Sequence, residues 1–397
     1  MLGSAIGGAV VYANWKKLAR ILRTGGYDPA ETDFAIGHGL VWDNIGGALN
    51  ASMMYIGDKL DIYKALLECC AVPGSSVTAI ELAEKTGLHQ RWLREWLAQQ
   101  AGMGVLRLLP GKGDDDADLR YRLPKATATV LADESSKEYD ISMIQIVPSL
   151  VNRAKTMLPL SFASGIGRPY DELDVAQAID RQHGRHFRDI FMPQVVPKAA
   201  DGRVLALLET GGATVADLGC GAGILILTMA KAYPHSTFHG FEISKPALEI
   251  AAKNIAQANI KNVVLHDANE SGESLGDYKE MYDLVTTFDV LHDCTDPQSL
   301  IAQVKTALKP ETGIWLLADI PAAPTVRENL AKMPAVGTYY GFSTCLCMSC
   351  ALSVEGGAGL GTLGFSLPVA NKLLKAGGFE NVDVLFEKDN ARWFVVT

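Results

Sequence analysis

Three glycines at alternate positions, set between an apolar strand and a helix, constrain the fold of this chain more than any other feature. Residues 215–218 predict a buried strand, Gly219, Gly221 and Gly223 a tight loop, and residues 224–233 a helix. Glycine lets the backbone turn sharply and approach a ligand, and the free N–H groups of the following helix point toward that ligand. The segment therefore predicts a strand–loop–helix unit that binds a small molecule.

From residue 202 onward, short apolar runs alternate with helical segments, which predicts a parallel sheet covered by helices on both faces. The predicted strands are 215–218, 237–242, 263–266, 283–288, 314–319, 382–386 and 393–396. Only a short polar turn separates the last two strands, and a connection that short forces a hairpin with an antiparallel final strand. We expect an α/β fold with a Rossmann-like, doubly wound, seven-stranded sheet.

Residues 28–131 predict a separate, mainly α-helical domain. A helix capped by Thr78 and closed by Gly87, a second helix, and two strands joined by a polar turn follow in the order of a winged helix. Apolar residues occupy most faces of the segment 40–68, which indicates burial against a partner. We therefore expect a winged-helix-like dimerisation domain and a homodimer formed through it.

Charge excludes several classes of partner. The chain of 397 residues has 36 Lys and Arg against 45 Asp and Glu, a net charge of −9, which disfavours broad binding to nucleic acid or acidic lipid. Four aspartates at 114–118, at the tip of the predicted strand pair, would repel phosphate. An uncharged run at 334–354 is rich in Gly, Ser, Thr and Pro, which predicts a buried pocket wall. We expect no nucleic acid and no membrane as partner.

Cysteine usage indicates the compartment. Seven cysteines, an odd number, are typical of a reducing environment, so we expect a cytoplasmic protein. Residues 1–27 form a basic N-terminal segment for which two interpretations stay open: an ordinary terminal helix, and a mitochondrial targeting peptide or membrane-surface helix. The remaining boundaries set apart a helical connector with a substrate-pocket segment at 132–200 and the sheet domain at 201–397.

Acidic residues around the glycine loop favour a nucleoside without phosphates. A dinucleotide site needs its third glycine at position 224, where this chain has isoleucine. Asp217, just before the loop, suits an ammonium group, and Glu242, at the end of the second strand, suits the two hydroxyls of an unphosphorylated ribose. Asp267 ends the third strand within reach of an adenine amino group. An amine, a ribose diol and an adenine without phosphate describe S-adenosylmethionine.

These motifs resemble those of the class I S-adenosylmethionine-dependent methyltransferases. From about residue 50 onward, the chain is similar to two-domain small-molecule methyltransferases of actinobacterial type, which carry an N-terminal winged helix; segments 55–60, 91–100 and 340–343 have close counterparts there. The resemblance implies a cofactor site made of Asp217, Gly219, Gly221, Gly223, Glu242, Ile243, Asp267, Ala268 and Asp289.

A histidine, His292, follows the fourth predicted strand. Substrates meet cofactors at the carboxyl ends of strands in open sheets, so we expect His292 near the transferable methyl group. The segment resembles that of small-molecule O-methyltransferases in which this histidine is the general base, with Cys294 in place of a tryptophan. The resemblance implies that Asp319 steadies the imidazole, and we include Asp293 in the catalytic set. A further family glutamate falls at 361–364, where this chain has no carboxylate.

Aromatic and apolar residues in two segments predict an acceptor pocket. They are Tyr170, His186, Phe187, Tyr339, Tyr340, Phe342 and Met348. The cluster Cys345, Cys347 and Cys350 and the pair of His183 with His186 lack further ligands at metal-site spacing, so we predict no metal.

The sequence thus predicts methyl transfer to a small-molecule acceptor, with a hydroxyl as the acceptor group and His292 as the base. Two alternatives stay open. One is a sulfur or nitrogen acceptor, for which a strong base is dispensable. The other is a non-catalytic regulator that senses S-adenosylmethionine through this fold and acts through the winged helix.

Overall fold

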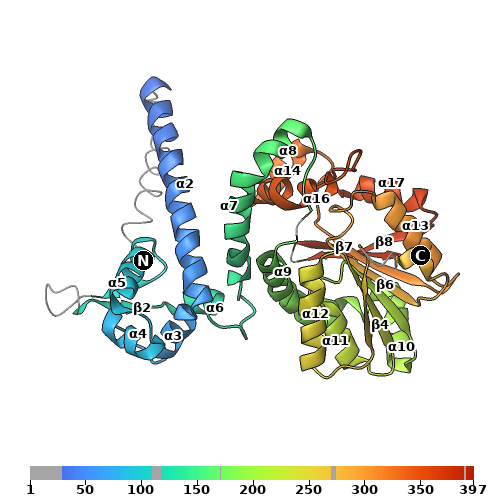
Figure 1. The fold of residues 1–397 in the computed structure, drawn as a ribbon, viewed down its shortest axis with the longest axis horizontal. Helices are drawn as coiled ribbons and strands as arrows, with labels where there is room; N and C mark the ends of the chain where they lie inside the picture. The colour runs from blue at the N-terminus through green and yellow to red at the C-terminus, as the bar shows by residue number, and fades with distance from the viewer. Residues whose placement is uncertain (1–28, 110–117, 170, 270–273, 389) are drawn as a thin grey trace. The chain divides into compact units, whose positions relative to one another are not determined.

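The computed structural model describes residues 29–109, 118–169, 171–269, 274–388 and 390–397, with side chains from residue 37 onward (Figure 1). The predicted basic segment 1–27, the aspartates at 114–116 and the pocket residue Tyr170 lie outside the described residues. The chain divides into two compact units, Met1–Val147 and Pro148–Thr397, so the connector at 132–200 is shared between them.

The first unit is mainly helical and contains one small strand pair. Its elements are α2 (Pro29–Lys59), α3 (Ile62–Cys69), α4 (Ala79–Thr86), α5 (Gln90–Gly102), β1 (Arg107–Leu109), β2 (Arg120–Arg122), α6 (Lys125–Leu131) and η2 (Ile141–Ile146). As the sequence predicts, Thr78 caps the start of α4 and Gly87 ends the helix with φ of 72°. The carboxylate of Glu81 in turn accepts the N–H of Thr78 at 2.8 Å, which completes a capping box. Trp96 packs edge to face on Tyr63 and donates its indole N–H to the carbonyl of Met53 at 2.9 Å.

The second unit opens with helices and continues into a seven-stranded sheet. The leading elements are α7 (Val147–Thr156), α8 (Leu158–Ser164), α9 (Leu173–His186), η3 (Phe187–Val195), η4 (Ala199–Gly202) and α10 (Arg203–Thr210). The strands are β3 (Thr214–Leu218), β4 (Thr237–Glu242), β5 (Val263–Asp267), β6 (Leu284–Phe288), β7 (Ile314–Asp319), β8 (Val382–Lys388) and β9 (Ala391–Val396). Each predicted strand is observed within two residues of its predicted ends, and a run of buried residues fixes the central strands β3, β6 and β7.

The strand order is β5-β4-β3-β6-β7-β9-β8. Strands β3 to β7 pair in parallel, whereas β9 lies antiparallel between β7 and β8. The predicted Rossmann-like sheet with an antiparallel final strand is confirmed. The order reverses at β3, and ligands bind outside the carboxyl ends of strands at such a switch point. The glycine loop leaves β3 at that end.

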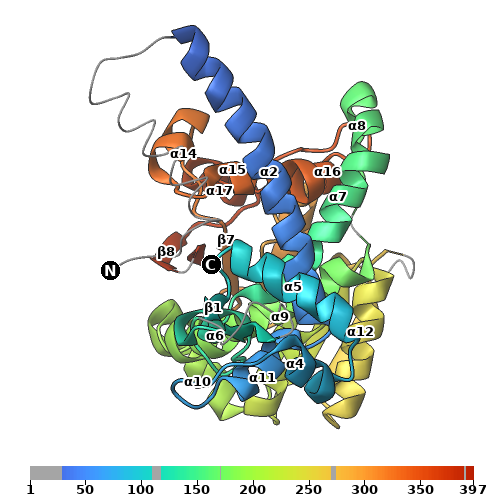
Figure 2. The same ribbon diagram turned by 90° about the vertical axis from the view of Figure 1, so that its left-hand side faces the viewer.

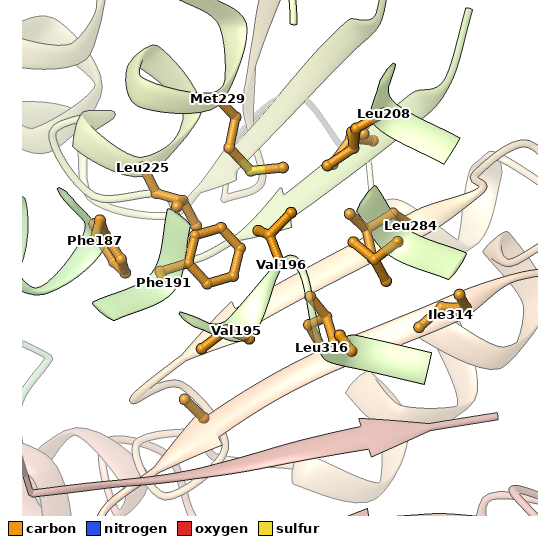
Figure 3. Close-up of a cluster of buried hydrophobic side chains, with 14 of the residues drawn as sticks. Phe187, Phe191, Val195, Val196, Leu208, Leu225, Met229, Leu284, Ile314 and Leu316 are labelled. Atoms are coloured by element: carbon orange, nitrogen blue, oxygen red, sulfur yellow. The ribbon is translucent and has the colours of Figure 1, made fainter. Parts of the chain in front are cut away.

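Two hydrophobic cores cover the two faces of this sheet. One contains residues of α10, of α11 (Ile224–Ala232) and of η3, which pack on alternate residues of β3, β6 and β7 (Figure 3). The other contains residues of α13 (Pro297–Ala307) and α17 (Leu367–Ala376) and the opposite face of the same strands. Figure 1 shows α11 and α12 (Lys245–Gln257) on one side of the sheet and α13 on the other. The sheet is therefore buried on both faces, as its continuous apolar strands require.

The segment predicted as a pocket wall forms three short helices. These are α15 (Val336–Phe342), η6 (Ser343–Cys347) and α16 (Met348–Ala351), after α14 (Val326–Lys332). In Figure 2, α7 and α8 lie on the same side of the unit as α16. The N–H of Gly167, just after α8, donates to the carbonyl of Leu352 at 2.8 Å. No helix in the described part of the chain combines the length and the apolar character that a bilayer span requires.

Glycines after α16 permit close packing of the backbone. A Cβ atom on Gly357 would lie 2.3 Å from the carbonyl oxygen of Ala351, and one on Gly361 would lie 2.3 Å from the hydroxyl of Ser343. The N–H of Gly361 donates to the carbonyl of His292 at 3.0 Å. These glycines hold the pocket-wall segment against the loop that carries His292.

Candidate active site

The glycine loop joins β3 to α11 in a conformation that side chains resist. Gly219, Gly221 and Gly223 have φ of 66°, 54° and 84°. A Cβ on Gly219 would lie 2.6 Å from Val290, whereas nothing lies within 4 Å of the Cβ position on Gly221. The loop therefore has one face packed on the protein and one bare face at Gly221, which a ligand can approach closely.

Glu242, the last residue of β4, is fixed by backbone donors. Its Oε2 accepts the N–H of Gly221 at 2.8 Å, and its Oε1 accepts the N–H groups of Ile243 and Ser244, each at 2.8 Å. Burial raises the pKa of this carboxyl, and the three N–H groups oppose the rise. Because a carboxylate accepts about four hydrogen bonds, one position stays available at Oε2.

Asp217 is buried beneath the loop. Its Oδ1 accepts the hydroxyl of Thr286, on β6, at 2.7 Å, and the residue is 3 % exposed. Burial raises the pKa of Asp217 to about 7, although the hydrogen bond from Thr286 opposes the rise. The residue links β3 to β6 directly under the glycine loop.

Asp267 and Glu242 are register partners at the ends of neighbouring strands. The Oδ1 of Asp267 accepts the N–H of Asn269 at 3.0 Å, and the N–H of Ala268 donates to the carbonyl of Glu242 at 2.9 Å. Ile243 is 54 % exposed, so an apolar side chain stands open beside the two carboxylates. These positions suit a nucleoside that lies across β4 and β5.

His292 and Asp319 form a buried pair at the carboxyl ends of the neighbouring strands β6 and β7. Nδ1 of His292 lies 2.7 Å from Oδ1 of Asp319, the last residue of β7, and the side chains are 2 % and 1 % exposed. Burial lowers the pKa of His292, but the charges of Asp319 and Asp293 outweigh it and hold that pKa well above its ordinary value. Burial raises the pKa of Asp319 to about 6, against the effect of His292. The imidazole and the carboxylate are therefore held together in a site that is shielded from solvent.

Asp293 and Cys347 stand at the other ring nitrogen. Nε2 of His292 lies 3.3 Å from Oδ1 of Asp293. Among the described residues, two groups have ligand atoms within 4.8 Å of one another: His292 with Asp293 and Cys347, and His292 with Asp289 and Asp319. Burial raises the pKa of the Cys347 thiol, while His292 opposes the rise. Sequence spacing gives no sign that Cys347 lies beside His292, because the two residues are 55 positions apart.

Asp289 follows β6 and has φ of 53°, a left-handed conformation that is costly for a residue with a side chain. Its Oδ2 lies 3.5 Å from Nε2 of His183 on α9. Burial opposes ionisation of Asp289, but the hydrogen bond and charge of His183 outweigh it and lower its pKa. This contact between α9 and the sheet edge was not predicted from the sequence.

Asp180 was also missed. It lies one helical turn before His183 on α9 and is half-buried, and burial raises its pKa to about 6 against the effects of His183 and of the N–H of Ile224. The contact with Ile224 puts Asp180 at the first residue of α11, where the glycine loop ends. The spacing of Asp180 and His183, three apart on one helix, was the available signal.

The predicted pocket residues occupy two environments. His186 stacks on Trp393 with ring centroids 5.3 Å apart, and Phe187 is 5 % exposed within the core of Figure 3. Tyr339, Tyr340, Phe342 and Met348 are half-buried on α15 and α16. Burial raises the pKa of the Tyr339 hydroxyl, and the charge of Asp289 adds to the rise. Tyr339, on the pocket-wall segment, therefore lies close enough to Asp289 to be influenced by its charge.

Arg153 holds this wall in place. Its side chain is 1 % exposed and donates two hydrogen bonds to the carboxylate of Glu172, at 2.7 and 2.8 Å. It also donates to the carbonyls of Arg168, Pro169 and Cys345. One buried guanidinium thus links α7, the segment before α9 and η6.

Comparison with known proteins gives concordant matches. A family model described as "Methyltransferase domain" matches residues 209–390. The ubiquinone biosynthesis O-methyltransferase of Shewanella sp. (strain ANA-3) is 33 % identical over 135 residues, 32 % of this chain and 55 % of that protein. The mitomycin biosynthesis 6-O-methyltransferase of Streptomyces lavendulae is 26 % identical over 310 residues, 74 % of this chain and 82 % of that protein. The chain spans about half or less of the length of the first such relatives.

A solved structure shares the fold across both units. Human N-acetylserotonin methyltransferase, in complex with SAM, superposes with a TM-score of 0.57 at 16 % identity, covering 94 % of this chain and 98 % of that chain. At this identity the likeness concerns the fold.

Proposed function

Because the chain belongs to the S-adenosylmethionine-dependent methyltransferases, we propose that it transfers a methyl group to a hydroxyl oxygen of a small molecule, with His292 as general base. One observation carries this proposal: the buried pair of His292 and Asp319 stands at the sheet edge that also carries the glycine loop. A buried imidazole held by a carboxylate at one ring nitrogen is suited to accept a proton at the other.

The residues around the glycine loop fit the cofactor. The bare face of Gly221 admits close approach of a ligand, and the remaining position at Oε2 of Glu242 accepts one ribose hydroxyl. Ile243 offers an apolar surface to the adenine ring, and Asp267 accepts its amino group. S-adenosylmethionine supplies a methyl group that is bound to a positively charged sulfur. Once the methyl group is transferred, the remaining cofactor is a neutral thioether.

The proton moves through His292. As the acceptor oxygen forms its bond to the methyl carbon, the carbon–sulfur bond breaks and its electron pair stays on sulfur. Nε2 of His292 takes the hydroxyl proton, and Asp319 stabilises the resulting imidazolium through Nδ1–H. A positioned base contributes about 100- to 10,000-fold in rate, and alignment of the reacting atoms supplies much of the rest.

The acceptor is a partly apolar molecule of limited size. Tyr339, Tyr340, Phe342 and Met348 supply half-buried aromatic and apolar surface, and Asp289 and Asp293 supply polar groups. Asp289 contacts either the cofactor or the acceptor. Aromatic surface with few polar groups is typical of sites for small aromatic molecules.

A transfer assay tests the proposal. The purified protein is incubated with S-adenosylmethionine labelled at the methyl group and with phenols, alcohols, thiols and amines, and products are identified by mass. We expect label in an oxygen ether and loss of transfer in His292→Gln. Transfer only to sulfur or nitrogen, unchanged in His292→Gln, contradicts the hydroxyl acceptor and the base. No transfer together with salt-dependent binding to duplex DNA favours the regulator.

We further propose that the protein is a homodimer. Trp42, Ile45 and Leu49 follow one another at helical spacing on α2 and are 67 %, 43 % and 58 % exposed. We expect Trp42→Glu with Leu49→Glu to turn the dimer into a monomer in sedimentation equilibrium. Leu160→Glu, an equally exposed leucine of α8, is the control and leaves the mass unchanged. A monomeric wild type contradicts this proposal.

We also propose the cytoplasm as the compartment, because seven cysteines, an odd number, are typical of a reducing environment.

A further inference from the structure

Three kinds of metal ligand meet beside the proposed base. Nε2 of His292, a carboxylate oxygen of Asp293 and the Sγ of Cys347 lie within 4.8 Å of one another. The first two residues belong to the loop after β6, and the third ends η6. The side chains of His292 and Asp293 are 2 % and 12 % exposed, so the cluster is largely shielded from solvent.

The hydrogen bond on the other side of the ring orients this cluster. Nδ1 of His292 contacts Oδ1 of Asp319 at 2.7 Å, which leaves the Nε2 lone pair directed toward Asp293 and Cys347. Metal-binding histidines usually donate their second N–H to a carboxylate, because this fixes the tautomer and makes the ligand nitrogen more basic. The buried pair therefore prepares Nε2 for a cation as well as for a proton.

We propose that His292, Asp293 and Cys347 form a binding site for a zinc-like divalent cation, and that the bound cation blocks methyl transfer. Imidazole nitrogen, thiolate and carboxylate together are ligands that zinc prefers, whereas magnesium and calcium prefer oxygen alone. Three protein ligands leave a fourth position for water. As the cation binds, Cys347 releases its thiol proton to solvent, and an imidazolium form of His292 also releases the proton on Nε2. The site goes beyond the proposed function and departs from the absence of metal that the sequence predicts.

Inhibition follows because a metal ion and the substrate proton would compete for the same lone pair, on Nε2 of His292. Nε2 of His292 holds either a proton or a metal ion, so a bound cation removes the base. This consequence rests on the proposed function, whereas cation binding itself does not.

Cobalt absorption tests the site independently of activity. The full chain is titrated with Co²⁺, and the thiolate-to-cobalt charge-transfer band in the near ultraviolet is followed. We expect one band that saturates in the wild type and is lost in Cys347→Ser. Cys345→Ser is the matched control: it carries the same substitution on the same helix, but its thiol is influenced by Arg153 and not by His292, so the band is retained.

Two further variants test the roles of Asp319 and Asp293 in cation binding. Asp319→Asn leaves all three ligands but removes the partner of Nδ1, so cobalt affinity falls about 10- to 100-fold. Asp293→Asn keeps the thiolate band but weakens binding, and circular dichroism shows that each variant is folded. A band of equal strength in wild type and Cys347→Ser, or no thiolate band in the wild type, overturns the site.

The activity arm separates the two proposals. Zn²⁺ is expected to suppress methyl transfer by the wild type, and chelation to restore it, while Mg²⁺ has no effect. A cobalt band that depends on Cys347, combined with transfer that Zn²⁺ leaves unchanged, keeps the metal site and refutes His292 as the base.

Discussion

Nδ1 of His292 and Oδ1 of Asp319 lie 2.7 Å apart, although the two residues are 27 positions apart in the sequence. His292 is in the loop after β6, and Asp319 ends β7, the strand that pairs with β6 in parallel. Both side chains are almost completely buried. Register between two neighbouring strands therefore sets the geometry of the proposed base.

Asp319→Asn is expected to shift the pH dependence of methyl transfer toward acid. The neutral imidazole is the base, so kcat/KM rises with pH through the raised pKa of His292. Burial lowers that pKa, and Asp319 and Asp293 raise it more. Removing the charge of Asp319 lowers the pKa, so the rise occurs at lower pH. Maximal kcat falls by about 100-fold or more, because the tautomer is no longer fixed.

A pH–rate profile of both proteins checks this prediction. Asp319→Glu is the control: it keeps the negative charge, and its alkaline midpoint is retained. An unchanged midpoint in Asp319→Asn would contradict the coupling of the pair.

Gly221→Ala is expected to weaken cofactor binding. Its loss of folding stability is expected to be similar to that of a Gly→Ala change at another glycine with positive φ. Gly221 has φ of 54° and nothing within 4 Å of its Cβ position, so the substitution costs about 1–2 kcal/mol of backbone strain. The new methyl group stands on the bare face of the loop, where it blocks the ligand. We expect at least a tenfold loss of affinity for S-adenosylhomocysteine, about 1.4 kcal/mol, by calorimetry.

Gly212 offers a matched control. It has φ of 79° and also has nothing within 4 Å of its Cβ position, but it lies in the turn before β3. Gly212→Ala carries the same backbone strain and leaves cofactor affinity unchanged. Equal affinities of the two variants would show that the bare face is not the binding surface.

Asp289→Ala is expected to be less stable than Asp289→Asn by about 1 kcal/mol in urea unfolding. Both variants lose the charge that faces His183, so their difference reports the left-handed backbone at φ of 53°. Asparagine tolerates this conformation better than alanine. If the two variants have the same free energy of unfolding, the left-handed backbone at position 289 does not destabilise the protein.

Arg153→Met is expected to destabilise the second unit by about 3–5 kcal/mol, because it leaves the Glu172 carboxylate and several carbonyls without their buried donor. The comparison is Arg91→Met, which removes an ion pair with Glu95 whose side chains are 54 % and 66 % exposed. That loss is about 0–1 kcal/mol. Urea unfolding followed by circular dichroism measures both, and similar losses would contradict a structural role for Arg153.

The fold was predictable because its signals are local. Each strand of the sheet is a short apolar run, and the polar residue that ends it is adjacent in sequence, as Glu242 and Asp319 show. Parallel pairing of β3 to β7 then brings the carboxyl ends of these five strands to one edge. The positions of the glycine loop, of Glu242 and of His292 relative to the sheet follow from that rule.

The contacts across this edge were not predictable in the same way. His183 reaches Asp289 because α9 packs on α11, and Cys347 reaches His292 because η6 folds back onto the loop after β6. Arg153 meets Cys345 across 192 positions of sequence. Neither composition nor periodicity predicts these contacts, because the contacts depend on how separate helices pack. The sequence showed which residues were available, and only the structure pairs them.

The place of β9 in the sheet has a consequence for synthesis. The strand that ends in Asp319 receives its second neighbour from residues 391–396, where Asp319 is in register with Arg392. During translation, β7 leaves the ribosome some seventy residues before this neighbour exists, and its outer edge has no hydrogen-bonding partner until then. The His292–Asp319 geometry is thus completed only after residues 391–396 have been made, and a nascent chain halted before them would present an open, aggregation-prone edge.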